Sequence, residues 1–202
     1  MMKRVLCVCV VVLGLLAGGA QAAVGPQQLV EETSAKVMEK LKQDEALIKS
    51  DPKHLVGLID RYILPHFDFE RMARWVLGKY WRRATPEQRQ RFIEEFRALL
   101  VRTYATSLTD FTDQPITYLP FRDDLAKGDV TVKSEVAQPG GLSIPIDYRL
   151  HLKNGEWKVY DIVIDDVSLV TNYRSSFARE IKRRGIQGLI DRLAERNRKV
   201  KQ

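Results

Sequence analysis

Cysteine is absent from the chain beyond its first 22 residues, because the only two cysteines are Cys7 and Cys9. This absence excludes a disulfide framework and a thiol nucleophile from the rest of the chain. Three histidines are present, and none has a second histidine or a cysteine at the spacing of a zinc site. Glycine-rich phosphate loops and the G-x-S-x-G nucleophile motif are also missing. The sequence therefore predicts no metal site, no cofactor and no catalytic residue.

Long apolar runs are lacking too, apart from one at the N-terminus. Lys3 and Arg4 precede an apolar run over residues 5–17, and Ala20-Gln21-Ala22 supplies an A-x-A cleavage site. The run is shorter than the roughly 20 residues that a transmembrane helix needs. We therefore expect residues 1–22 to be a cleaved signal peptide and residues 23–202 to form a single exported domain.

Acidic residues are outnumbered, with 26 Asp and Glu against 33 Lys and Arg and a net charge of +7. Without Lys3 and Arg4 the net charge is +5. A basic balance fits anionic lipid headgroups, acidic protein partners or an ordinary charged surface. Export argues against nucleic acid as a partner, so the sequence predicts none.

Helical periodicity dominates up to about residue 113. Start signals stand at Pro26, at Asp51 followed by a proline, and at Asp68. The clearest is Thr85-Pro86-Glu87-Gln88, in which Thr85 and Gln88 fit a capping box. This last signal predicts a helix of about 24 residues with a wide aromatic stripe.

Strand-like alternation replaces the helical pattern between residues 113 and 167. Apolar and polar residues alternate strictly over 143–153, and Asn154-Gly155 is a strong hairpin signal before the returning strand. The apolar parity of that strand flips near Tyr160-Asp161, which predicts a bulge or burial on both faces. Helical periodicity then resumes, and Gly185 interrupts it. The fold class is α+β, a small antiparallel sheet with surrounding helices.

One set of polar residues suggests an enzyme, a proton-transfer catalyst of a cone-shaped fold, as an alternative to a protein without catalytic residues. Asp147 and His151 lie four residues apart on one predicted strand, so they share a face, and Asp161 lies on the neighbouring strand. The first face also carries Arg149 and Lys153, which indicates a solvated surface. Asp161 falls in an apolar row, where we expect backbone amides or a nearby Tyr or Arg to satisfy its carboxylate.

Three separated segments carry a resemblance to a known family. They run from Phe67 to Arg89, from Trp157 to Asp161 and from Val167 to Arg174. In this order and spacing they resemble the MlaC / toluene-tolerance family of periplasmic phospholipid-binding proteins. One departure is Asp165-Asp166, where the family pattern has Glu-Gly. If that glycine supplies a positive φ, Asp166 tolerates the turn less well.

The resemblance implies a broadly cone-shaped, NTF-like fold with a deep apolar pocket for phospholipid acyl chains, and no enzymatic activity. It also implies the role of a shuttle in the Mla lipid transport system, which maintains outer-membrane lipid asymmetry. The implied partners are phospholipid, an outer-membrane lipoprotein–porin complex and an inner-membrane ABC transporter complex.

The expected lipid-binding residues come from the long helix, the sheet and the start of the closing helical section. A third possibility remains open at this stage, a protein-binding module with a filled core and no pocket beyond about 300 Å³. The predicted lipid contacts are Phe96, Leu100, Tyr104, Val132, Ile144, Ile146, Tyr148, Trp157, Val159, Val167, Val170 and Tyr173.

Overall fold

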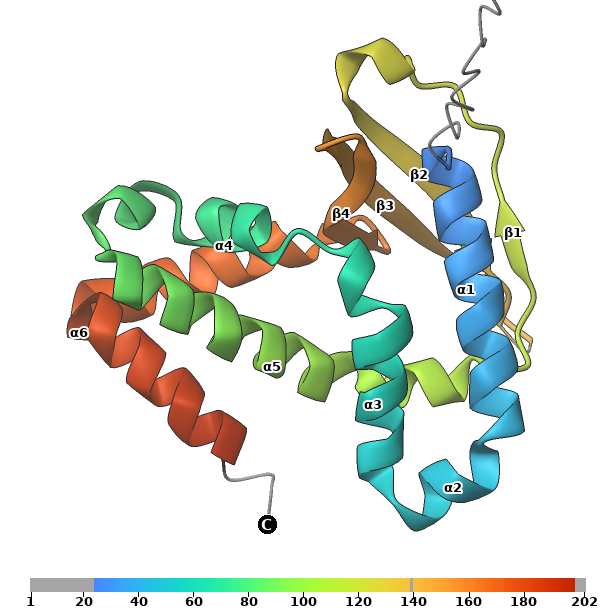
Figure 1. Ribbon diagram of the computed structural model, residues 1–202, viewed down its shortest axis with the longest axis horizontal. Coiled ribbons are helices and arrows are strands. Elements are labelled where there is room, and N and C mark those ends of the chain that lie inside the picture. Colours follow the sequence, from blue (N-terminus) through green and yellow to red (C-terminus); the bar gives the residue numbers. More distant parts are fainter. Residues whose placement is uncertain (1–23, 139, 199–202) are drawn as a thin grey trace, which may run out of the picture.

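The computed structural model describes residues 24–138 and 140–198, so the predicted signal peptide lies outside the described residues (Figure 1). Six α-helices, three short 3-10 helices and five strands make up this part of the chain. The helices are α1 (Pro26–Gln43), α2 (Glu45–Ser50), α3 (Pro52–Tyr62), η1 (Leu64–His66), α4 (Phe69–Leu77), η2 (Gly78–Arg83), α5 (Pro86–Asp110), η3 (Leu125–Lys127) and α6 (Leu169–Arg198). The strands are β1 (Ile116–Tyr118), β2 (Asp129–Val136), β3 (Ile144–Lys153), β4 (Glu156–Ile164) and β5 (Val167–Ser168).

All four predicted helix starts are confirmed, and those at Asp51, Asp68 and Thr85 have side-chain capping hydrogen bonds, whereas α1 begins at Pro26 without one. Asp68 accepts a bond of 3.0 Å from the Arg71 amide at the start of α4. At α5, Thr85 accepts from the Gln88 amide at 3.2 Å, and the Gln88 side chain accepts from the Thr85 amide at 3.1 Å. These bonds satisfy amides that have no partner within the helix. Local sequence therefore fixes where these helices begin.

The five strands form one antiparallel sheet in the order β1-β2-β3-β4-β5. Asn154 and Gly155 take φ values of 52° and 83° in the β3–β4 hairpin, as that turn requires. The predicted bulge is confirmed, because Val159 pairs with Leu150 and Asp161 pairs with Arg149, which leaves Tyr160 unpaired. Strands β1 and β5 were not predicted, since three and two residues are too short to show alternation.

The turn from β4 to β5 accommodates the departure at Asp165-Asp166. Both aspartates adopt positive φ values, 48° and 60°. Aspartate is one of the few non-glycine residues that enter this region readily. The turn therefore forms without glycine, and α6 begins directly after β5.

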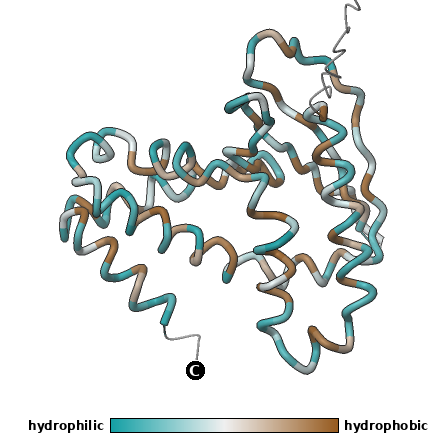
Figure 2. Tube along the Cα trace, viewed as in Figure 1, coloured by the Kyte–Doolittle hydropathy of each residue, from teal (hydrophilic) through white to brown (hydrophobic). Residues whose placement is uncertain are grey.

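Two groups of helices pack around the sheet (Figure 1). Helix α1 crosses one face of the sheet, and α3 lies beside it, whereas α4, α5 and α6 pack together as a helical lobe. Hydrophobic and hydrophilic residues alternate along these helices (Figure 2), as expected for helices that bury one side. Gly185 has φ 71° and ψ 176° and breaks α6 into two parts, which confirms the predicted interruption.

Three apolar clusters stabilise this arrangement. The largest fills the helical lobe between α4, α5 and α6 and includes Phe92 and Phe96. A second lies between α1 and the sheet, and a third joins α1, α3 and the second half of α5. The long helix α5 therefore belongs to two regions, with its first half in the core of the helical lobe and its second half against α1 and α3.

Candidate functional site

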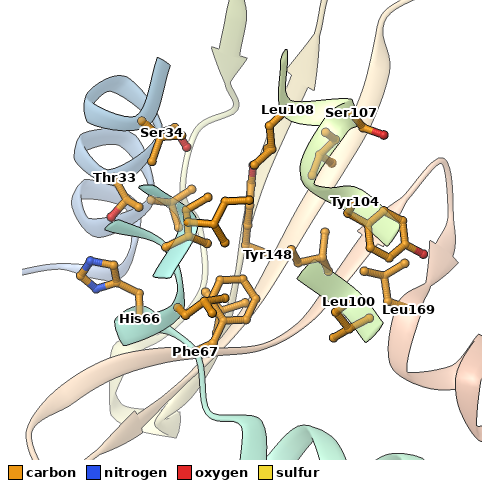
Figure 3. A pocket seen from close by; sticks show the side chains of 18 of the residues that line it. Thr33, Ser34, His66, Phe67, Leu100, Tyr104, Ser107, Leu108, Tyr148 and Leu169 are labelled. Atoms are coloured by element: carbon orange, nitrogen blue, oxygen red, sulfur yellow. The ribbon is translucent and has the colours of Figure 1, made fainter. Parts of the chain in front are cut away.

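An apolar cavity of about 280 Å³ lies where α1, α3, η1 and the second half of α5 meet the sheet (Figure 3). In Figure 3, Leu100 and Tyr104 of α5 lie on one side of the cavity, and Thr33 of α1 and His66 lie on the other. The wall is made by Leu29, Val30, Thr33, Ser34, Val37, Met38, Ile59, Ile63, Leu64, His66, Phe67, Phe69, Met72, Leu100, Val101, Tyr104, Ala105, Ser107, Leu108, Phe111, Ile116, Val136, Ile146, Tyr148, Val159, Ile162, Ile164 and Leu169.

The bulge in β4 decides which sheet residues reach this wall. Val159 and Ile162 are three positions apart, so in a regular strand they would point to opposite faces. The extra residue Tyr160 shifts the register, and both side chains face the cavity. On β3, Ile146 and Tyr148 join them by simple alternation. Because of the bulge, Val159 before it and Ile162 and Ile164 after it all lie on the cavity side of the sheet.

The cavity wall carries no charged side chain at neutral pH among the described residues. Its polar members are hydroxyl groups and one histidine. Burial raises the pKa of Tyr148 to about 12. Burial, with a contribution from the neighbouring Tyr173, also raises the pKa of Tyr104 to about 12. Burial and the charge of Lys158 lower the pKa of His66, which favours its neutral form. Such a wall suits alkyl chains and offers no acid–base pair.

Five of the twelve predicted lipid contacts lie in the wall: Leu100, Tyr104, Ile146, Tyr148 and Val159. These five residues belong to α5, β3 and β4. Whether they touch lipid stays a prediction, since the structure holds the protein alone.

The structure places the other seven predicted contacts outside the wall. Phe96 and Val170 are buried in the helical lobe, and the partly buried Tyr173 packs against the same cluster. Val132 and Trp157 pack in the cluster between α1 and the sheet, and Val167 is 53% exposed on β5. The remaining residue, Ile144, is half-buried at the first position of β3 and does not border the cavity. The physical reason is that apolar periodicity marks a buried side without saying whether protein or ligand covers it.

Sequence reasoning missed the contribution of α1, α3 and η1 to the wall. Val30, Thr33 and Val37 repeat at helical spacing, so their stripe is visible in the sequence. The same stripe is expected for a helix that packs on a solid core. Only the tertiary structure shows that it borders a cavity.

The face of β3 that carries Asp147 and His151 is not uniformly solvated, contrary to expectation. His151 is only 8% exposed, and its Nε2 lies 3.0 Å from Oδ2 of Asp68. The N-terminal end of α4 covers this part of the sheet, because the Asp68 amide donates to the Val159 carbonyl at 2.9 Å. Asp147 is partly exposed and lies 3.7 Å from Lys133. These two residues therefore form no common site with each other.

Asp161 is satisfied by protein donors, as the sequence predicted. Its carboxylate accepts hydrogen bonds from Ser168 Oγ at 2.6 Å, from the Val170 amide at 3.1 Å and from Arg149 at 3.2 Å. The residue is 3% exposed and ties β4 to β3 and to the start of α6. The contacts give Asp161 a structural role.

We expect Asp161→Asn to lower the free energy of unfolding by about 2 kcal/mol, because an amide cannot accept all three bonds and brings a competing donor. Urea denaturation followed by circular dichroism measures this change. Asp147→Asn, on the partly exposed side of the same sheet, is the control and should change stability by less than about 0.5 kcal/mol. Equal stability of the Asp161 variant and wild type would contradict the structural role.

The described residues contain no group of three or more His, Cys, Asp or Glu side chains that could hold a metal ion. Within the same part of the chain, no helix is long and apolar enough to span a membrane.

The cavity volume lies just below the approximately 300 Å³ at which small-molecule sites begin. This volume by itself favours the filled-core alternative. The uncharged wall, in contrast, favours a binding site for apolar ligands.

Comparison with known proteins gives consistent results. The family model described as MlaC protein matches residues 31–195. The chain is 30% identical to toluene tolerance protein ttg2D of Pseudomonas putida, over 100% of this chain and 93% of that protein. It is 26% identical to the intermembrane phospholipid transport system binding protein MlaC of Haemophilus influenzae, over 87% and 84% of the two chains.

A solved structure extends these similarities to three dimensions. The phospholipid-binding protein from Ralstonia solanacearum, solved in complex with a phospholipid, superposes with a TM-score of 0.80 at 35% identity. The alignment covers 90% of this chain and 100% of that one. The α+β architecture is therefore shared with a protein that holds a phospholipid.

Proposed function

Because the chain belongs to the MlaC family, we propose that it binds a phospholipid in the cavity and carries it through the periplasm. The observation that carries the proposal is the uncharged wall between sheet and helices, in a fold shared with a protein solved in complex with a phospholipid. The named relatives are binding and transport proteins, and the chain is not an enzyme. The proton-transfer alternative is therefore set aside.

The energetics of lipid tails support enclosure. A diacyl lipid has about 30 methylenes, and exposing them to water at ~0.8 kcal/mol each costs roughly 24 kcal/mol. This cost exceeds the roughly 18–21 kcal/mol that limits noncovalent binding from water. A carrier must therefore cover most of both tails, so that membrane and protein compete on nearly equal terms.

The proposed carrier works between two membranes. We infer partners of the kind that the family implies, an outer-membrane lipoprotein–porin complex and an inner-membrane ABC transporter complex. In this scheme residues 1–22 direct export and are removed, and the shuttle maintains outer-membrane lipid asymmetry. Net direction comes from the partners, because a nearly balanced exchange has no direction of its own.

Native mass spectrometry of the full-length protein, expressed and exported in bacteria with normal membranes, tests the proposal. We expect a major species heavier than the protein by the mass of one or more phospholipids, and extraction should release those lipids. Denaturing conditions should remove the added mass, which separates bound lipid from covalent modification. A preparation without phospholipid would contradict the proposed function.

A further inference from the structure

The segment Phe67-Asp68-Phe69 alternates two cavity residues with one buried carboxylate. The rings of Phe67 and Phe69 border the cavity and stack on each other with centroids 5.8 Å apart. Asp68 is 6% exposed and does not border the cavity. Lipid binding as proposed above uses the two rings and leaves the carboxylate unexplained.

Asp68 joins three elements of the structure. Its amide donates to the Val159 carbonyl of β4 at 2.9 Å, and its Oδ1 accepts from the Arg71 amide of α4 at 3.0 Å. Its Oδ2 lies 3.0 Å from His151 Nε2 and 2.9 Å from Lys153 Nζ, both on β3. The backbone amide and the carboxylate of Asp68 together fix this residue, which lies between the two phenylalanines, to β3, β4 and α4.

The surroundings of His151 balance charge only while the imidazole is neutral. Arg71 of α4 pairs with Asp129 of β2 at 2.5 Å, and its guanidinium lies 4.1 Å from the centroid of the Tyr160 ring. The Tyr160 ring of β4 also contacts the His151 ring, with centroids 5.7 Å apart. On β4, Lys158 is the cross-strand partner of His151 and pairs with Glu156 at 2.7 Å. Three carboxylates, those of Asp68, Asp129 and Glu156, therefore face three cations, Arg71, Lys153 and Lys158. A proton on His151 adds an unmatched positive charge in a buried place.

We propose that Asp68 is a positioning residue of the lipid site, and that a positive charge on buried His151, close to Arg71 and Lys153, weakens the packing of α4 on the sheet, frees Phe67 and Phe69 and speeds lipid release. His151 donates Nε2–H to the ionised carboxylate in either protonation state, so a proton acts through its added charge. That charge disfavours the closed wall, in which the start of α4 lies against β3 and β4. This inference rests on the proposed function, since it concerns retention of the same lipid.

The pH range follows from the directions of the pKa shifts. Burial and the charge of Arg71 lower the pKa of His151, and they outweigh the opposing effects of Asp68 and Asp129. The closed wall is therefore favoured above the ordinary histidine pKa of about 6.5 and loses that advantage as the pH falls below it. Burial acts to raise the pKa of Asp68, but bonds from Arg71, Lys153 and His151 lower it overall. Asp68 stays ionised near pH 5, so His151 is the group that titrates.

The test measures transfer of a fluorescent phosphatidylethanolamine from preloaded protein to phosphatidylcholine vesicles at pH 7.5 and pH 5.0. Wild type should release the probe faster at pH 5.0, by up to about tenfold per pH unit, the limit for one proton. His151→Gln should show little pH dependence, because glutamine still donates to Asp68 and does not titrate in this range. Asp68→Asn should release the probe faster than wild type already at pH 7.5.

Two further histidine variants serve as controls. His54 pairs with Asp44 at 2.7 Å, and neither residue borders the cavity, so His54→Gln should behave as wild type. His66 borders the cavity and also has a lowered pKa, so His66→Gln separates its titration from that of His151. His66→Gln should retain the pH dependence of wild type.

The outcomes separate this inference from the proposed function. If wild type loads no probe, the proposed function fails, and this inference fails with it. If wild type loads normally but releases the probe equally at both pH values, or if His151→Gln keeps the full pH dependence, only the positioning role is contradicted. Should Asp68→Asn not fold, the comparison of wild type, His151→Gln and His66→Gln still decides.

Discussion

Ile146→Glu is expected to reduce phospholipid occupancy at least tenfold while leaving helix content unchanged. Ile146 lies on β3 in the cavity wall, paired with Ser134 on one side and Ile164 on the other. An ionised carboxylate covered by acyl chains loses its hydration, at a cost of several kcal/mol without a partner. Each 1.4 kcal/mol corresponds to a factor of ten in affinity, so the expected loss is large.

Native mass spectrometry and circular dichroism of the Ile146 variant provide the measurement. Val167→Glu is the matched control, because Val167 is 53% exposed on β5 and lies outside the wall. It should keep wild-type occupancy, although the sequence suggested it as a lipid contact. Full occupancy in the Ile146 variant, or the same loss in both variants, would show that the cavity is not the lipid site.

Phe96→Ala should lower the free energy of unfolding by about 3–5 kcal/mol, as expected for truncation of a fully buried aromatic residue. Its ring contacts those of Phe92, Tyr173 and Phe177, with centroids 5.6, 5.3 and 6.0 Å apart. These contacts lie inside the helical lobe, and none of the four rings borders the cavity. Lipid occupancy per folded molecule should therefore be unchanged.

Leu100→Ala, one turn further along α5, is the contrasting variant for the same measurements. Leu100 is half-buried and borders the cavity, so its truncation removes fewer protein contacts and should destabilise the fold less than the Phe96 change. It should weaken lipid retention instead. The division of α5 into a core half and a cavity half is wrong if Phe96→Ala changes occupancy and Leu100→Ala does not.

The sequence by itself determined the local features of this protein. Thr85 and Gln88 lie three residues apart, so their reciprocal caps can be read from the chain, and Asn154-Gly155 dictates its own hairpin. The parity flip at Tyr160 likewise predicted the bulge that brings Ile162 into the wall. Each of these features depends on groups close in sequence, and the ordered family motifs extended the prediction to the whole fold.

Only the tertiary structure decided where the cavity lies and what surrounds it. Phe96 and Leu100 belong to one apolar stripe, yet the first is fully buried in the helical lobe and the second borders the cavity. Asp68 and His151 are separated by 83 residues, and no local pattern predicts their hydrogen bond. Burial of an apolar residue lowers the free energy whichever atoms cover it, so a sequence records the need for cover, and the packing of distant elements determines whether protein or lipid provides it.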